Sequence, residues 1–249
     1  MAKETGLGAN FYVDGVDLSG DSGAMRRISM PMQVLPKTGL DKFAMERNPG
    51  QLDSYIDWQS WFNPAAGQAH PNLADPPRTD RIATYFHKGN VLGTPAANQI
   101  GKQLTYAPTR GEDGSLVINV DTAGNGNSLD WGYSLTTGKR TDTAATDGTG
   151  VDFGAANSFG LQAYLHVFSF TGTDVTIKLQ ESSDDGAGDA FADVTGGGFT
   201  QVTSAPLAEA IATGRALAVE RYLRVVTTGT FDEVIFAVAV RVNRTSWVV

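Results

Sequence analysis

The chain has 249 residues, of which 41% are hydrophobic and 18% are charged, so it can bury a core and is not a disordered polyelectrolyte. Its formal net charge of −8 disfavours tight binding to nucleic-acid phosphates, which requires clustered Lys and Arg. The absence of cysteine excludes disulfides, thiolate metal sites and cysteine nucleophiles.

The N-terminal region is predicted to form short strands. Asn10–Leu18 reads as two strands around an Asp-Gly turn. In Met25–Leu35 apolar residues alternate with polar ones, but Pro31 cannot donate to a ladder, so this strand is expected at an edge or with a bulge.

A short helix is predicted next. Asp41 is placed to cap it, it runs to Arg47, and the Asn-Pro-Gly sequence that follows ends it. Because a helix of under two turns is marginal alone, packing of Phe43 and Met45 is expected to hold it.

The middle of the chain contains further strand patterns. These cover Tyr55–Phe62, Arg81–His87, Gly101–Tyr106, Ser115–Val120 and Leu129–Leu135. The third and fourth are expected to pair as a hairpin around Arg110–Gly114. Residues 36–80 read as a loop-rich insertion. Residues 141–158, rich in Thr, Asp, Gly and Ala, are predicted to be a long flexible connection.

The C-terminal region has the clearest strand patterns. Gln162–Phe170 and Asp174–Gln180 are followed by an acidic turn at Ser182–Asp189 and a strand within Phe191–Val202. Pro206–Arg215 favours a strand pair around Thr213-Gly214, with a short helix as the alternative. The whole chain, 1–249, is expected to form a single β domain, with a division near residue 150 as the alternative.

The stretch Val219–Val242 predicts a hairpin with its corner at Gly229. Apolar side chains alternate along it, as in a strand with one buried face. The candidate core residues are Leu223, Val225, Val234, Phe236, Val238 and Val240. Ala237 and Ala239 lie on the opposite face, where another layer or another subunit can approach closely.

No catalytic, cofactor-binding or metal-binding residue is predicted. His70, His87 and His166 lack the spacing of a metal site, and Asp121–Asp130 lacks the ligand pattern of a calcium loop. No nucleophile elbow, P-loop or dinucleotide fingerprint occurs. The acidic Ser182–Asp189 segment is interpreted as a hairpin tip, and the chain as non-enzymatic.

Five parts of the chain have a distinctive sequence: Met1–Gly8, Thr38–Arg47, Ser54–Pro64, Pro77–Tyr85 and the segment from Arg221 through Val240. These segments resemble the major tail proteins of long-tailed phages of actinobacteria. The resemblance implies a β-sandwich with a helix at its flank, but the sequence has no obvious long flanking helix unless Pro206–Arg215 supplies it. The expected fold is therefore mainly β, of the β-sandwich or barrel type, with at most one or two short helices. The resemblance also implies six-membered rings that stack into a hollow tail tube, through which DNA passes during ejection, and no cofactor.

This resemblance makes the expected partners other copies of the chain, other tail proteins at the tube ends, and passing double-stranded DNA without specific binding. The expected location is the virion tail, after synthesis in the host cytoplasm. The polar start predicts no signal peptide, and no apolar run is long enough for a membrane helix. The candidate contacts between rings and subunits are Lys37, Leu40, Phe43, Met45 and Arg47.

Other functions remain open from the sequence. The chain fits another β-type virion protein, such as a capsid decoration or head-to-tail joining protein. It also fits a carbohydrate-binding β-sandwich that uses Trp58 or Trp131, or, least of all, a glycoside hydrolase. Trp58 and Trp61 are three residues apart, which places them on opposite faces of a strand, so at least one is expected in the core.

Overall fold

The computed structural model describes residues 5–245, which form nineteen strands and one short helix. The elements are β1 (Asn10–Val13), β2 (Val16–Asp17), β3 (Ser22–Ser29), β4 (Met32–Pro36), β5 (Arg47–Leu52), β6 (Tyr55–Trp61), α1 (Ala69–Leu73), β7 (Arg81–Phe86), β8 (Pro95–Gln103), β9 (Ala107–Arg110), β10 (Leu116–Val120), β11 (Thr122–Gly124), β12 (Asp130–Ser134), β13 (Arg140–Asp142), β14 (Thr146–Asp147), β15 (Val151–Asp152), β16 (Leu161–Ser182), β17 (Ala192–Gly198), β18 (Leu207–Ala212) and β19 (Tyr222–Val242). The predicted mainly β fold is confirmed, and residues 5–245 form open antiparallel sheets without a closed barrel.

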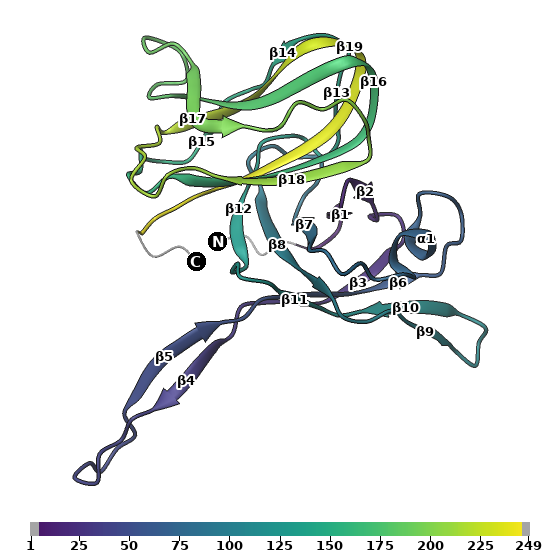
Figure 1. The fold of residues 1–249 in the computed structure, drawn as a ribbon, viewed down its shortest axis with the longest axis vertical. Helices are drawn as coiled ribbons and strands as arrows, with labels where there is room; N and C mark the ends of the chain where they lie inside the picture. Colours follow the sequence, from purple (N-terminus) through teal and green to yellow (C-terminus); the bar gives the residue numbers. More distant parts are fainter. Residues whose placement is uncertain (1–4, 246–249) are drawn as a thin grey trace.

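The upper half of the molecule is built from two very long strands (Figure 1). β16 and β19 pair antiparallel along almost their whole length, with irregular register around Gly172. Gly172 and Gly229 have φ values of 145° and 134°, and a Cβ at Gly172 would lie 2.4 Å from the Cα of Phe231. Only glycine tolerates this close approach of two backbones. The hairpin predicted at Gly229 is therefore wrong, because this glycine lies inside one continuous strand.

The first hydrophobic core lies within this long strand pair and the strands beside it. Side chains from the early part of β16, such as Leu165, share the core with Ile177 and Leu179 from its later part. All six candidate core residues are fully buried there: Leu223, Val225, Val234, Phe236, Val238 and Val240. The strand pair therefore curls around its own apolar side chains.

The segment predicted as a long flexible connection is laid along β19 instead. β13, β14 and β15 each pair with β19, and Arg140 contributes to this attachment. Its guanidinium donates to both carboxylate oxygens of Asp142 at 2.7 and 2.8 Å and to the carbonyl of Val225 at 3.0 Å. The low-complexity composition concealed these short pairings, because they depend on a partner strand about eighty residues away.

The second core lies in the lower half, where the four-stranded sheet β3-β6-β10-β9 faces one end of the thirteen-stranded sheet. Trp58 is completely buried in it and packs edge-on against Phe11, with ring centroids 4.8 Å apart. Trp61 is 53% exposed, which confirms that the two tryptophans take opposite faces of β6. Ala237 and Ala239 are buried in a third cluster, so a layer of the same chain covers the alanine face.

The structure confirms some of the predictions about local structure and contradicts others. Asp14 and Gly15 form the predicted turn between β1 and β2, with φ values of 50° and 78°. The hairpin loop at Arg110–Gly114 is also present, but it joins β10 to β9 and not to the predicted Gly101–Tyr106. Pro206–Arg215 contains strand β18, which pairs with β16, but the rest of this segment, Thr213–Arg215, forms no second strand.

Burial of His166 predicts acid sensitivity. Its Nδ1 accepts a hydrogen bond from the Gly15 amide at 3.2 Å and its Nε2 lies 2.9 Å from Thr84 Oγ1, so the ring is neutral. Burial lowers the pKa of His166 from 6.5 to about 3. The unfolded chain therefore takes up a proton below pH 6.5 that the folded chain refuses, and stability falls as pH drops from 6.5 towards 3. The expected loss is roughly 4–5 kcal/mol.

This pH dependence is measured by denaturant unfolding at several pH values, in the wild type and in His166→Gln. The carboxylates contribute to both proteins and cancel in the difference. The wild type is expected to lose stability more steeply over this window. Equal slopes would show that His166 becomes protonated without unfolding the chain.

Candidate assembly surface

The most prominent surface feature is a hairpin that projects from the lower half of the molecule (Figure 1). It consists of β4, β5 and the connecting tip, and we call residues 30–52 the arm. Every residue from 30 to 49 is exposed. Two-stranded hairpins are marginally stable by themselves in water, so an arm without a core is expected to gain order from a partner.

The predicted helix from Asp41 to Arg47 is wrong, because this segment forms the tip of the arm and the start of β5. Two hydrogen bonds close the tip: the Lys37 amide donates to the Glu46 carbonyl at 3.0 Å, and the Glu46 amide donates to Thr38 Oγ1 at 3.0 Å. All residues between the two strands are exposed, so no core is within reach. A short helix needs such packing, and here it is absent.

The arm carries more than half of the exposed large hydrophobic side chains found in the described part of the chain. They are Met30, Met32, Val34, Leu35, Leu40, Phe43 and Met45. The exposed fraction reaches 110% for Leu40 and Phe43 and is 57% for Met45. Contiguous exposed apolar surface of this kind marks a site of protein interaction.

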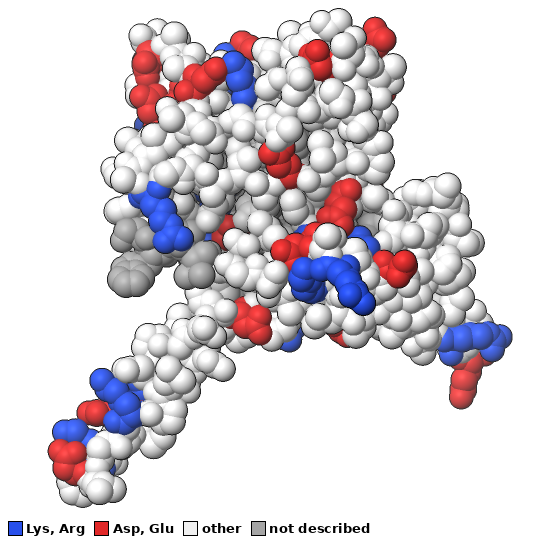
Figure 2. All heavy atoms as spheres, in the orientation of Figure 1, with Lys and Arg blue, Asp and Glu red and all other residues white. Residues whose placement is uncertain are grey.

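The structure places the five candidate contact residues together at the end of the arm: Lys37, Leu40, Phe43, Met45 and Arg47. All of them are exposed. The shaft of the arm behind them has no charged side chain, and Figure 2 shows the charges gathered at the tip. An uncharged shaft loses little hydration when a partner covers it, whereas a charged one would require compensating pairs.

Proline limits how the arm can bind. Pro36 and Pro49 lie within its two strands and Pro31 lies just before β4. Proline offers no N–H to a further strand, so it blunts a sheet edge. The arm is therefore suited to bury its side chains against a partner and poorly suited to extend a partner's sheet.

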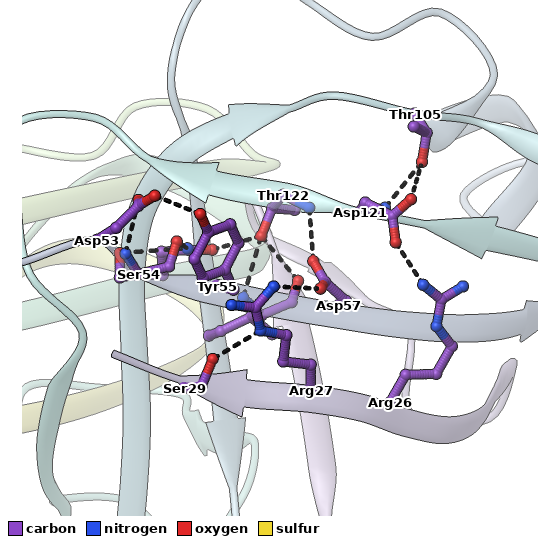
Figure 3. Close-up of polar contacts among 12 residues, drawn as sticks. Arg26, Arg27, Ser29, Asp53, Ser54, Tyr55, Asp57, Thr105, Asp121 and Thr122 are labelled. Carbon is purple, nitrogen blue, oxygen red and sulfur yellow. Dashed lines mark hydrogen bonds and ion pairs between the residues drawn. The ribbon is translucent and has the colours of Figure 1, made fainter. Parts of the chain in front are cut away.

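The base of the arm is anchored by a polar network (Figure 3). The Arg27 guanidinium lies 3.5 Å from the Tyr55 ring centroid and its Nε donates to Ser29 Oγ at 2.7 Å. The Tyr55 hydroxyl donates to the Asp53 carboxylate, which raises the pKa of Tyr55. The Asp53 amide donates to the Pro31 carbonyl at 3.0 Å. These contacts join the residues that enter and leave the arm.

Further bonds tie this base to the body. The Thr122 amide donates to the nearly buried Asp57 carboxylate at 2.8 Å, and Thr122 Oγ1 lies 2.8 Å from the Ile56 carbonyl. Beside them, Arg26 forms an ion pair with Asp121, which also accepts a hydrogen bond from Thr105 at 3.0 Å (Figure 3). The arm is thus exposed, while its base is fixed to the body of the molecule.

The arm is also electrostatically distinct from the rest of the chain. Its tip carries three cations, Lys37, Lys42 and Arg47, and two anions, Asp41 and Glu46, for a formal charge of +1. The whole chain has −8, so the remainder has −9. A positively charged tip is attracted to acidic surfaces, and such attraction weakens as salt rises.

The chemistry-bearing residues lie apart from one another. Among residues 5–245, no group of three or more His, Asp or Glu side chains is placed to hold a metal ion. His70 lies beside Tyr106, with Nδ1 and the hydroxyl 2.6 Å apart, while His166 is in the interior. Asp184 in the Ser182–Asp189 turn accepts amide hydrogen bonds from residues 188 and 189, as a turn-forming aspartate does. No helix of the described chain is long and apolar enough to span a membrane.

Comparisons with known proteins give limited likenesses. Neither a family model nor a curated protein matches the chain. Solved structures with some likeness are a chain of the native gene transfer agent virion, at 13% identity and a TM-score of 0.37, and the Dit protein of SPP1, a hub of the adsorption apparatus in phages that infect Gram-positive bacteria, at 12% and 0.34. A third is a chain of the phage p2 baseplate, at 9% and 0.33.

The first likeness covers 51% of this chain and 97% of the gene transfer agent chain. The second and third each cover 94% of this chain, with 99% and 98% of the respective neighbours. The neighbours are components of phages and virions. The likenesses are too low to place this chain in their families.

Proposed function

We propose that this chain is a structural virion protein, the protomer of a phage tail tube, and that it builds stacked hexameric rings. The observation that carries the proposal is the arm, whose tip exposes Leu40 and Phe43 completely. The resemblance of Thr38–Arg47 to major tail proteins falls on the same tip. The arm then forms the contact between one ring and the next.

The energetics favour burial of the arm tip in an assembly. Covering Leu40 and Phe43 contributes about 1.5–3 kcal/mol per side chain. A tube repeats this contact in every copy, so a modest free energy per contact is multiplied along the structure. The apolar shaft, including Val34 and Leu35, adds further area where a neighbour covers it.

Closure of each ring uses sheet edges. The main path of the thirteen-stranded sheet ends at β17 on one side and β2 on the other. Edge strands of this kind offer unpaired N–H and C=O groups to identical copies, which suits a protein that forms rings. The formal net charge of −8 disfavours binding of DNA phosphates in the lumen during ejection.

Negative-stain electron microscopy and sedimentation velocity of the purified chain test this function. Six-fold annular particles, and tubes at higher concentration, are the expected result. A capsid decoration or head-to-tail joining protein needs its capsid or portal partners and would remain unassembled alone. Single copies at every concentration would therefore refute a self-assembling tube protomer.

A further inference from the structure

We infer that the arm tip of one copy inserts Leu40 and Phe43 into an aromatic groove beside β12 of the next copy. This inference rests on the proposed self-assembly and names the surface that receives the arm. The groove has a volume of about 780 Å³. That size lies within the range of roughly 300–1,000 Å³ seen for pockets that enclose substantial apolar groups.

Exposed aromatic side chains line the groove. Trp131 and Tyr133 on β12 are 51% and 36% exposed, and Phe153 packs edge-on against Tyr133 with ring centroids 5.6 Å apart. Aromatic side chains at the centre of an interface contribute most to binding, because they bury large apolar areas with little loss of conformational freedom. A leucine and a phenylalanine are suitable apolar partners for such a surface.

One charged group of the groove, Arg244, complements one charged group of the arm, Glu46. Arg241 is already neutralised by the buried Asp130, which also accepts a hydrogen bond from Tyr164. Arg244 is exposed and has no ion pair within the described chain, and the same holds for the Glu46 carboxylate on the arm. Insertion of the tip brings one unpaired cation and one unpaired anion to the same interface.

The occupant is another copy because the arm cannot serve its own groove. Met30, at the base of the arm, lines the groove, whereas five strand residues carry the tip away from that base. At ~3.4 Å per residue the strands alone place the tip roughly 17 Å away. Figure 1 shows the arm directed away from the body. Because the arm tip and the groove lie at different places on one molecule, their contact between two copies is head-to-tail. Repeated head-to-tail contacts produce rings or filaments.

A matched pair of variants tests the groove. Trp131→Ala removes its largest exposed ring, and Trp61→Ala removes a tryptophan of almost equal exposure, 53% against 51%, outside it. Trp131→Ala is expected to raise the protein concentration needed for assembly by thirtyfold or more, about the effect of losing an interface hot spot. Trp61→Ala is expected to assemble as the wild type does.

Phe43→Asp separates this inference from the function on which it rests. If Phe43→Asp stops assembly while Trp131→Ala behaves like Trp61→Ala, the arm is a contact but the groove is not its receptor. If Phe43→Asp and Trp131→Ala both assemble normally, the arm contact and the groove are refuted together. Thermal unfolding of each variant monitors the fold.

A photo-crosslink identifies the occupant directly. Benzoylphenylalanine in place of Tyr133 is expected to crosslink to residues 38–46 of another copy, which mixing of isotopically labelled and unlabelled protein would show. A crosslink to residues 246–249 of the same copy would overturn the inference. The reversal Arg244→Glu is expected to weaken assembly severalfold and Glu46→Arg in the same chain to restore it, whereas failure to restore it counts against the pairing.

Discussion

Replacement of Thr38–Met45 by Asn-Gly is expected to give a folded protomer that builds no tubes. The Lys37 amide and the Glu46 carbonyl are already hydrogen-bonded at 3.0 Å, and Asn-Gly is the preferred two-residue connection for such a pair of strand ends. The change removes Leu40 and Phe43 together. Loss of about 3–6 kcal/mol per contact corresponds to roughly a 10²- to 10⁴-fold weaker association.

The measurement is negative-stain microscopy combined with thermal unfolding. An unchanged melting temperature is expected, because none of the replaced residues belongs to a core. A matched control replaces residues 112–114 in the exposed loop between β9 and β10 with Asn-Gly and is expected to leave assembly intact. Tubes of normal length from the shortened arm would refute its role.

Phe236→Ala is expected to lower the free energy of unfolding by about 3–5 kcal/mol. The Phe236 side chain is fully buried in the core that β16 and β19 enclose, so its removal leaves a cavity among rigid β-strands. The Arg140 guanidinium lies 5.5 Å from the ring centroid and loses that neighbour as well. Chemical denaturation measures the change.

Phe43→Ala is the matched control for this substitution. The same side chain is removed, but Phe43 is fully exposed, so stability is expected to change by less than about 0.5 kcal/mol. Assembly is expected to weaken in Phe43→Ala even though its fold is intact. Equal melting temperatures for Phe236→Ala and the wild type would show that the core has been wrongly assigned.

Alternation of apolar residues predicted most of the strands, because a half-buried strand imposes a period of two on its sequence. It did not predict the continuity of β19 through Gly229. A glycine between two β-rich runs is typical of a hairpin corner, and the bend becomes visible only from its partner, Gly172, in the paired strand. A backbone contact between residues far apart in the chain decides between a hairpin corner and a bend within one continuous strand.

In the arm, local sequence signals predicted a helix that does not form. Asp41 and the later Asn-Pro-Gly are local helix signals, but a helix there has no core to pack against, so tertiary context overrides them. The alternation from Met30 to Val34 predicted a strand. That its apolar face is exposed depends on the missing second layer, which a single sequence does not reveal. The groove at Trp131 and Tyr133 likewise depends on the proximity of residues far apart in the chain.

The most direct test is an electron cryomicroscopy reconstruction of the particles formed by the purified wild-type chain. The expected map shows hexameric rings in which the Phe43 side chain of each copy is buried against a neighbouring copy. Particles in which the arm lies free in solvent, or single copies at every concentration, would contradict assembly through the arm.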